Sequence, residues 1–380
     1  MKILHVAALA ADVPSGPATS VPLQMVAEAR AGHEVAFLQS AVGQPIALPA
    51  GVRRLGDPRG RQVWRDLFAI GALFERARFW PDIVHFHSVY LVQHALAARA
   101  VRRLGLPTVN SPRGGLMPAA LATSRAKKRL ADLLFFDRFC RGLALHRALT
   151  EAERRACRLR YPEVPALVAA NPVDLDARAR VRPPRVADRP LALGYLGRLD
   201  VHYKGLDLLL AGLRAALDYG STAGLQLRLH GPDHRGGRRR LLRLIEALRL
   251  GPHVQLGEPL EGERRRAFFA DVDVFVHPSR SEGLPMGVLE AMAAARPVVV
   301  TPETNLGDVV ERHRAGWLVA GNASALGRLL STLPAQADEL AARGEAARRA
   351  ACAEFSLEAV GVRLARAYAA VCRRREAVVA

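Results

Sequence analysis

Short apolar runs alternate along the chain with longer stretches in which apolar residues recur every three or four positions. The short runs predict strands, and the longer periodic stretches predict amphipathic helices. Several short runs are apolar throughout, as expected of parallel strands that are covered on both faces. In the first half the predicted strands are residues 2–9, 34–39, 82–87, 107–111, 143–149 and 166–170, with helices at 21–30, 61–78 and 91–104.

This pattern stops once and then starts again. Residues 176–190 are polar, contain several prolines and lack apolar periodicity, so they predict a linker. Beyond the linker the predicted strands are residues 191–196, 225–230, 254–256, 272–277, 297–301 and 317–319. Each half opens with a strand, a glycine-containing loop and a helix, which is typical of a doubly wound α/β domain.

The sequence therefore predicts an α/β protein with two doubly wound domains, residues 1–185 and 186–355, and a C-terminal helix within residues 356–380. Leu357, Val360, Leu364, Tyr368 and Val371 lie at helical spacing, so this helix should pack its apolar face on a domain, and we expect it to pack back toward the N-terminal one. Doubly wound sheets bind ligands at the carboxyl ends of their strands, which predicts a ligand cleft between the domains.

Charge is the unusual feature of the composition. The 380 residues include 55 Lys and Arg against 36 Asp and Glu, a formal net charge of +19. Such an excess favours nucleic acid, an anionic membrane or an anionic substrate as a partner. Because almost all of it is arginine, it is equally typical of a GC-rich genome. The sequence has neither an RNA-reading aromatic motif nor a zinc-finger pattern, so we expect no nucleic-acid partner.

Cysteine usage and hydropathy indicate the compartment. The four cysteines are scattered, which predicts free thiols in a reducing cytosol. No uninterrupted apolar stretch reaches about 18 residues, so no segment should span a bilayer. The apolar start of the chain contains His5 and predicts a strand rather than a secretory signal. We expect a cytoplasmic protein, with peripheral binding to the inner face of the cell membrane as the alternative.

The strongest local pattern runs from residue 277 to residue 301. His277 ends a strand and is expected to contact the loop that follows, which contains Glu282 and Gly283. A helix should begin near Pro285 and place Glu290 about one turn inside. A helix N-terminus suits a phosphate, and two carboxylates beside it can accept hydrogen bonds from ligand hydroxyls. Solvated or helix-capping charges are the alternative interpretation.

A second pattern opens the second half. A strand leads into Gly197 and Arg198, and Lys204 and Gly205 precede an apolar helix. Two cations at the carboxyl end of a strand can neutralise a pyrophosphate without a metal. Lys204 is notable because the chain has only three other lysines.

These two segments resemble the retaining nucleotide-sugar glycosyltransferases of family 4, the glycosyl transferases group 1. Residues 282–290 match the E-x7-E motif of that family, and residues 197–205 match its G-R-L...K-G phosphate loop. Further matching segments follow in the expected order at residues 81–88, 111–116, 149–153, 171–175, 229–233 and 316–319. The resemblance implies the GT-B fold, in which two Rossmann-like domains face a central cleft.

The resemblance also implies roles for individual residues. Arg198 and Lys204 would hold the donor diphosphate, Glu290 the ribose hydroxyls, and Glu282 hydroxyls of the donor sugar. Gly16 would let the backbone approach the donor phosphates, although the family usually has two adjacent glycines where this chain has Gly16 and Pro17. The implied catalytic residues are Glu282, Arg198, Lys204 and Arg113, and the implied donor-binding residues are Gly16, Gly197, Arg198, Lys204, Glu282, Gly283, Leu284, Pro285, Met286 and Glu290.

Many members of the family have a histidine where this chain has Arg113. A cation there would stabilise negative charge on a leaving phosphate, and an acceptor-binding or structural arginine is the alternative. His87 is a candidate for contact with the acceptor, whereas His85 is expected to be structural. We expect His85 and His87 to point to opposite faces of their strand and therefore not to share a metal. No metal or cofactor is expected besides the nucleotide-sugar donor.

One further segment differs in kind. Residues 125–141 place basic residues beside Leu130, Leu133, Leu134, Phe136 and Phe139. Such a segment can lie on an anionic membrane surface. The favoured interpretation is a helix whose apolar face packs inside the N-terminal domain.

Together these patterns predict a retaining glycosyltransferase. It would move a sugar from a UDP- or GDP-linked donor to an acceptor hydroxyl, on a glycan or lipid-linked glycan of cell-envelope or exopolysaccharide synthesis. The alternatives are a GT-B-like nucleotide-sugar epimerase or hydrolase, and a non-catalytic protein that binds a polyanion or a membrane.

Overall fold

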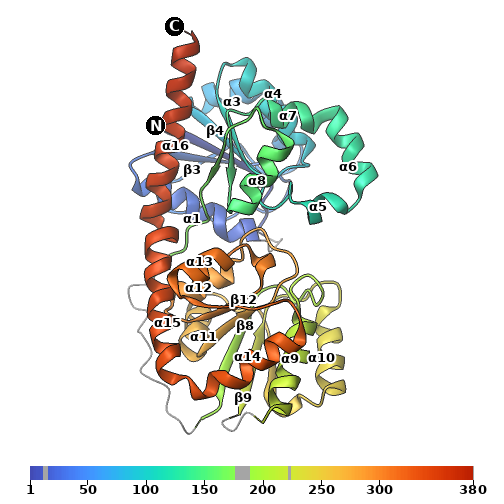
Figure 1. The fold of residues 1–380 in the computed structure, drawn as a ribbon. Coiled ribbons are helices and arrows are strands. Elements are labelled where there is room, and N and C mark those ends of the chain that lie inside the picture. Colours follow the sequence, from blue (N-terminus) through green and yellow to red (C-terminus); the bar gives the residue numbers. More distant parts are fainter. Residues whose placement is uncertain (12–15, 176–188, 221–223, 380) are drawn as a thin grey trace. The chain divides into compact units, whose positions relative to one another are not determined.

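The computed structural model describes residues 1–11, 16–175, 189–220 and 224–379. The chain forms two compact units, one made of Met1–Pro172 with Leu357–Ala380 and the other of Val173–Ser356 (Figure 1). Each unit has one parallel sheet flanked by helices, as predicted. Most of the predicted linker, residues 176–188, and with it the predicted boundary between residues 185 and 186, lies outside the described residues.

The described part of the first unit has a sheet of seven strands in the order β3-β2-β1-β4-β5-β6-β7. Every neighbouring pair is parallel. The strands are β1 Lys2–Ala7, β2 Glu34–Gln39, β3 Arg53–Leu55, β4 Ile83–His87, β5 Thr108–Ser111, β6 Leu145–Ala148 and β7 Ala166–Val168. The helices are α1 Gly16–Arg30, α2 Gln62–Phe68, α3 Ile70–Ala77, α4 Val92–Arg103, α5 Pro118–Ala122, α6 Arg125–Ala131, α7 Asp137–Arg141, α8 Glu151–Arg160 and α16 Leu357–Val379, with a π-helix at Asp132–Phe136.

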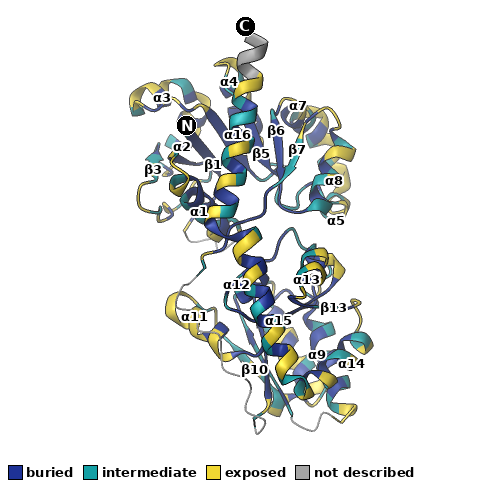
Figure 2. Ribbon diagram, turned by 60° about the vertical axis from the view of Figure 1, so that its left-hand side comes forward, coloured by how far each residue is buried: buried dark blue, intermediate teal, exposed yellow. Residues whose placement is uncertain are grey.

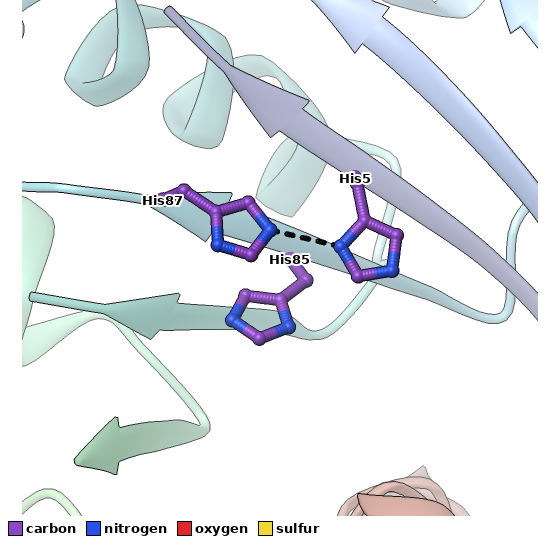
Figure 3. Close-up of side chains that lie close together, drawn as sticks. All are labelled: His5, His85 and His87. Carbon is purple, nitrogen blue, oxygen red and sulfur yellow. Dashed lines mark hydrogen bonds between the residues drawn. The ribbon is translucent and has the colours of Figure 1, made fainter. Parts of the chain in front are cut away.

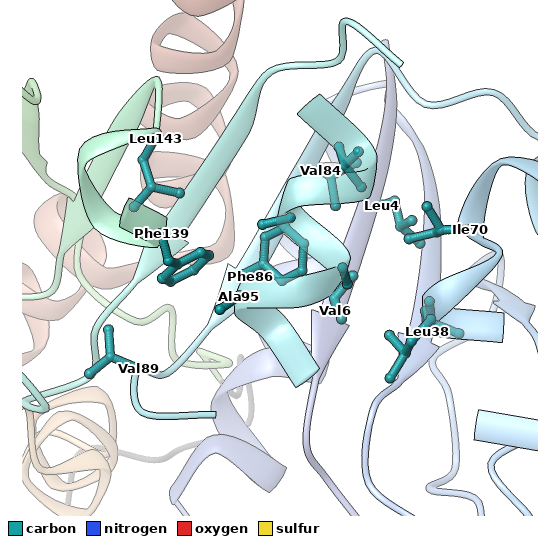
Figure 4. Packing of buried hydrophobic residues seen from close by; sticks show 14 of the residues in the cluster. Leu4, Val6, Leu38, Ile70, Val84, Phe86, Val89, Ala95, Phe139 and Leu143 are labelled. Atoms are coloured by element: carbon teal, nitrogen blue, oxygen red, sulfur yellow. The ribbon is translucent and has the colours of Figure 1, made fainter. Parts of the chain in front are cut away.

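Alternate residues of the central strands face two different cores. Leu4 and Val6 of β1 and Val84 and Phe86 of β4 point into a core shared with α2, α3, α4 and α7 (Figure 4). The residues between them point to the other face of the sheet, where Ile3 and Ile83 contact apolar residues of α16. That second face also carries His5, His85 and His87, so it combines an apolar region with a polar one.

Helix α16 belongs to the first unit although it ends the chain. Leu357, Val360, Leu364, Tyr368 and Val371 are buried, which confirms the predicted apolar face. In Figure 2 α16 alternates between buried and exposed residues, as an amphipathic helix should. No helix in the described part of the chain combines the length and apolar character that a membrane span requires.

The basic-apolar segment does not pack as the favoured interpretation expected. Phe136 and Phe139 are buried, but Leu130, Leu133 and Leu134 are 59%, 80% and 58% exposed. None of the seven residues of α6 is buried. The interpretation is therefore wrong for the three leucines, whereas Ala131, Phe135, Phe136 and Phe139 do contact the core.

The described part of the second unit has a sheet of six parallel strands in the order β10-β9-β8-β11-β12-β13. All six strands predicted for this half are present. They are β8 Leu191–Leu196, β9 Leu225–His230, β10 Val254–Gly257, β11 Val274–His277, β12 Val298–Val300 and β13 Gly316–Leu318. The main helices are α9 Leu206–Asp218, α10 Gly237–Ala247, α11 Gly262–Asp271, α12 Met286–Ala293, α13 Gly307–His313, α14 Ala323–Thr332 and α15 Ala337–Ala350.

Candidate active site

In the second unit, the loop after β8 and the turn before α9 carry the predicted cations. Gly197 follows β8 and its N–H donates to the His230 carbonyl over 3.0 Å, while Arg198 is exposed. Lys204 ends the turn, followed by Gly205 with φ +64°. A Cβ atom at Gly205 would lie 1.9 Å from the Pro278 carbonyl oxygen, so this glycine lets the turn approach the loop after β11.

The approach brings Lys204 to Glu282. Oε1 of Glu282 accepts hydrogen bonds from Lys204 Nζ, from His277 Nε2 at 2.8 Å and from Ser279 Oγ at 3.0 Å. Burial raises the pKa of Glu282, but the His277 hydrogen bond and the Lys204 charge outweigh burial and lower it to about 2. Glu282 is therefore ionised at neutral pH, and the expected contact of His277 with the loop is confirmed.

Helix α12 begins one residue after the predicted position, with Pro285 as its N-cap, and no side chain caps its first N–H groups. Leu284 and Pro285 are buried, whereas Gly283 and Met286 are partly exposed.

Glu290 is the fifth residue of α12, as predicted. Its carboxylate accepts two hydrogen bonds from Arg265 of α11, at 2.6 and 2.8 Å. Sequence reasoning missed Arg265, because nothing distinguishes it from the many other arginines of the chain.

In the first unit, Arg113 lies in the loop after β5 with φ +55°. Its guanidinium donates to Ser20 Oγ at 2.7 Å, to Asn171 Oδ1 at 3.4 Å, and to His87 Nδ1 from Nε at 3.3 Å and from Nη2 at 3.1 Å. Ser20 Oγ in turn donates to the Gly16 carbonyl at 3.1 Å. The structure thus brings the predicted residues Gly16, His87 and Arg113 together.

The backbone and charge of Arg113 are both unusual. A non-glycine residue with positive φ is strained, and such residues cluster at functional sites. Burial and the charge of Arg147 lower the pKa of Arg113 to about 9, so it is still a cation at neutral pH. Among the described residues its hydrogen-bond acceptors are a ring nitrogen, a hydroxyl and an amide oxygen, and none of them is a carboxylate.

The neighbouring backbone is fixed by Glu153, which lies in the first turn of α8. Its carboxylate accepts from the N–H of Gly114 at 2.5 Å and from that of Leu149 at 2.7 Å. Glu153 thereby holds the strained loop to the end of β6, a role that its place in the sequence did not reveal.

The expectation for His85 and His87 is wrong. Residues two apart in a strand point to the same face, and here both rings lie beside His5 of β1 (Figure 3). The His85 and His87 rings stack 4.4 Å apart at 17°. One nitrogen of each of these three rings lies within 4.8 Å of the others, close enough for the three to share an ion.

The two histidines of β4 have different partners. His85 lies between Tyr368 OH at 2.6 Å and Ser111 Oγ at 2.8 Å, which suits its expected structural role. His87 is 1% exposed, and both its ring nitrogens are occupied, by His5 and by Arg113. In this arrangement His87 has no nitrogen available for the acceptor contact that we expected.

Two family models match the chain, one in each unit. The model described as "Glycosyl transferase 4-like domain" matches residues 15–174, and the one described as "Glycosyl transferases group 1" matches residues 190–335. Solved structures with similar folds include a sucrose-phosphate synthase from Thermosynechococcus elongatus, with 19% identity, a TM-score of 0.76 and coverage of 98% of this chain and 99% of that one. Another is Anabaena Alr3699/HepE in complex with UDP and glucose, with 18% identity, a TM-score of 0.73 and coverage of 97% and 99%.

Curated relatives share more sequence over shorter regions. The putative colanic acid biosynthesis glycosyltransferase WcaL of Escherichia coli K12 is 31% identical over 212 residues, which are 54% of this chain and 51% of the relative. The D-inositol 3-phosphate glycosyltransferase of Streptomyces scabiei is 28% identical over 311 residues, 76% of this chain and 68% of the relative. The match to WcaL thus spans about half the length of that protein. With matching models in both units and the fold of these enzymes, the chain belongs to the group 1 glycosyltransferases of the GT-B fold.

Proposed function

We propose that the protein transfers a sugar from a nucleoside diphosphate sugar to an acceptor hydroxyl. The observation that carries this proposal is the grouping of Lys204, Glu282 and the start of α12. A cation, a carboxylate and free helix N–H groups there suit a sugar diphosphate. UDP is the first donor nucleotide to test, since a structural neighbour binds UDP, and GDP is the second.

Each group has a proposed role toward the donor. Arg198, Lys204 and the N–H groups of α12 bind the diphosphate. Gly197 and residues 283–286 line this diphosphate site. Glu290 accepts from the ribose hydroxyls and Glu282 from hydroxyls of the sugar. The Glu282 carboxylate keeps Oε2 for this purpose, because the three hydrogen bonds described above converge on Oε1. Gly16 suits close approach by a ligand, because a Cβ there would meet no atom of the described residues beyond its own helix turn within 4 Å.

The proposed reaction retains the configuration of the sugar. The bond from the anomeric carbon to the phosphate oxygen breaks while a bond to the acceptor oxygen forms on the same face, and the acceptor proton moves to the leaving phosphate. Positive groups that are already in place stabilise the charge developing on that phosphate. Arg198 and Lys204 supply such charge without a metal, and Arg113 is the candidate from the first unit.

Donor binding is tested by thermal unfolding with UDP, GDP and their glucose and mannose conjugates. We expect at least one of them to raise the melting temperature of the wild type and none to do so for Lys204→Ala. Arg214→Ala is the matched control, because Arg214 pairs only with Asp218 on an exposed helix turn. If no nucleotide stabilises the wild type, the proposal fails. Product released with donor alone would instead favour an epimerase or hydrolase, and an inverted product would rule out retention.

We propose a lipid-linked glycan as the acceptor, reached at the cytoplasmic face of the membrane. The support is α6 and the π-helix that follows it, where Leu130, Leu133 and Leu134 are exposed beside Arg125, Lys127 and Arg129. Cationic groups flanking exposed leucines complement an anionic bilayer, where each basic residue contributes about 1 kcal/mol.

Sedimentation with vesicles tests this surface. Wild type should sediment with vesicles containing phosphatidylglycerol and not with pure phosphatidylcholine, and the double variant Leu133→Ser and Leu134→Ser should lose most of the binding. Leu159→Ser is the control, since Leu159 is 88% exposed on α8. Unchanged vesicle binding by the double variant contradicts the proposal. So does a double variant that still binds vesicles and differs from the wild type only in no longer forming a dimer.

A further inference from the structure

Behind Arg113, on the covered face of the first sheet, lies a chain of three buried side chains: Glu28 of α1, His5 of β1 and His87 of β4. His87 Nε2 lies 2.9 Å from His5 Nδ1, and His5 Nε2 lies 2.5 Å from Glu28 Oε2. All three are at most 1% exposed. With the bonds from Arg113 to His87 Nδ1, this makes an unbroken hydrogen-bonded path from a guanidinium to a carboxylate.

The two ends of this path fix every proton in it. A guanidinium can only donate, so His87 Nδ1 must accept and its proton must be on Nε2. His87 then donates to His5 Nδ1, which leaves the His5 proton on Nε2, facing the carboxylate. One protonation pattern therefore satisfies all the bonds, and in it every group donates toward Glu28. Burial and the positive charge of its neighbours hold the pKa of His87 well below its usual range, in keeping with a neutral ring.

Glu28 supplies the negative charge at the end of the path. Burial raises its pKa, but the electrostatic and hydrogen-bond contact with His5, together with the hydrogen bonds from Gln24 and Tyr368, outweighs burial and lowers it, so Glu28 is ionised at neutral pH. Gln24 Nε2 at 2.9 Å and Tyr368 OH at 3.0 Å both donate to its other oxygen. Helix α16 thus fixes this carboxylate through Tyr368.

The path determines which part of Arg113 remains available. His87 takes the Nε proton and one Nη2 proton, and Ser20 and Asn171 take those on Nη1. One Nη2–H is left without a partner among the described residues. Arg113 donates to no carboxylate there, so its charge is compensated through polarised neutral groups and by the electrostatic attraction of Glu153, which makes no hydrogen bond to it. A cation held in this way keeps both a free donor and a net charge for an anionic ligand.

We propose that Glu28, His5 and His87 form a positioning relay that fixes Arg113 and keeps its remaining N–H available for a phosphate of the donor. This rests on the proposed function. None of the three residues contacts the donor, and each acts through Arg113. The relay also accounts for the positive φ of Arg113. Because the hydrogen bonds to His87 fix the position of the guanidinium, they also constrain the position of the Arg113 Cα atom and its backbone conformation.

Coupled variants test the relay. Glu28→Gln keeps an acceptor for His5 and removes the charge, and it should lower kcat about tenfold or more with an unchanged donor KM. Arg113→Ala should lower kcat further, and adding Glu28→Gln to it should have no additional effect. Glu34→Gln, at an exposed glutamate of the same unit, is the control and should leave kcat unchanged. Losses that multiply in the double variant, or a normal kcat in Glu28→Gln, would overturn the relay.

A readout that does not depend on activity separates this proposal from the proposed function. Long-range nitrogen–proton NMR spectra of the full chain should show His5 and His87 as neutral rings protonated on Nε2, with signals assigned from His5→Phe and His87→Phe. Either ring protonated on Nδ1 overturns the relay even if the enzyme is active. If Glu28→Gln folds poorly, Tyr368→Phe removes one bond to the same carboxylate and should lower kcat in the same direction by a smaller factor.

Discussion

Glu282 keeps its negative charge although its side chain is only 10% exposed, because three donors converge on one of its oxygens. The same arrangement makes a contribution to stability that depends on pH. Folding lowers the pKa of this carboxyl from 4.5 to about 2, so the folded protein binds the proton less readily than the unfolded chain. The stabilisation is therefore complete above about pH 4.5 and is lost as the pH falls toward 2.

The prediction compares the wild type with Glu282→Gln in urea unfolding between pH 7 and pH 3. At neutral pH the wild type should be the more stable by on the order of 3 kcal/mol, and the gap should narrow steadily below about pH 4.5. A gap that stays constant over this range would mean that the charge of Glu282 contributes nothing to stability.

A comparison of two glycines of the second unit distinguishes the cost of a left-handed backbone from the cost of a steric clash. Gly205 and Gly220 both have positive φ, but a Cβ would lie 1.9 Å from the Pro278 carbonyl oxygen at Gly205 and would meet no atom within 4 Å at Gly220. Gly220→Ala should cost about 1–2 kcal/mol, the usual cost of the left-handed conformation. Gly205→Ala should cost several kcal/mol, and it should abolish the nucleotide-induced thermal shift by displacing Lys204. Equal losses in thermal unfolding would contradict this assignment.

Residues of the donor region were easier to predict than those of the relay. Lys204, Glu282 and Glu290 follow strands or begin helices in a recognisable spacing, and their local setting is as predicted. The relay joins β1, α1 and β4 and is fixed from α16, and Gln24 and Tyr368, which meet there, are 344 positions apart. No local pattern marks such a site, because each of its members looks like an ordinary core or surface residue in its own segment.

At the scale of elements, apolar runs predicted several strands to the residue. Strands β2, β8 and β9 have the predicted bounds. Edge strand β3 was missed, because only Leu55 of its three residues is buried and no apolar run marks it. The predicted helix at residues 61–78 is divided at Ala69, whose φ of −106° and ψ of 44° leave the helical region. Because alanine favours helix, the sequence does not predict a break at this position.

Helix α16 should be as important to the first unit as a central strand. Leu364 is 1% exposed in a cluster with Ile3, Ile83 and Val109, so Leu364→Ala should cost about 2–5 kcal/mol. Val362, two residues earlier on the same helix, is 47% exposed, and Val362→Ala should change stability by no more than about 0.5 kcal/mol. Denaturant titration measures both, and similar losses would mean that α16 does not pack on the sheet in solution.

The whole molecule has two units with separate cores, so its unfolding need not be a single transition. Calorimetry should resolve two components that respond to different changes. Leu364→Ala should lower the melting temperature of the component from the first unit. The nucleotide bound near Lys204 should raise the melting temperature of the component from the second unit. If both changes shift one undivided transition equally, the units unfold together.

The position of α16 in the sequence also has a consequence for synthesis. The second unit is continuous in sequence, so all its strands have been made before translation ends. The first unit begins earlier, yet the apolar residues of α16 that cover Ile3 and Ile83 are synthesised after the whole of the second unit. The usual order of folding from the N-terminus is therefore reversed. The nascent first sheet therefore leaves one face uncovered until α16 has been synthesised, so the first unit cannot be completed before the second.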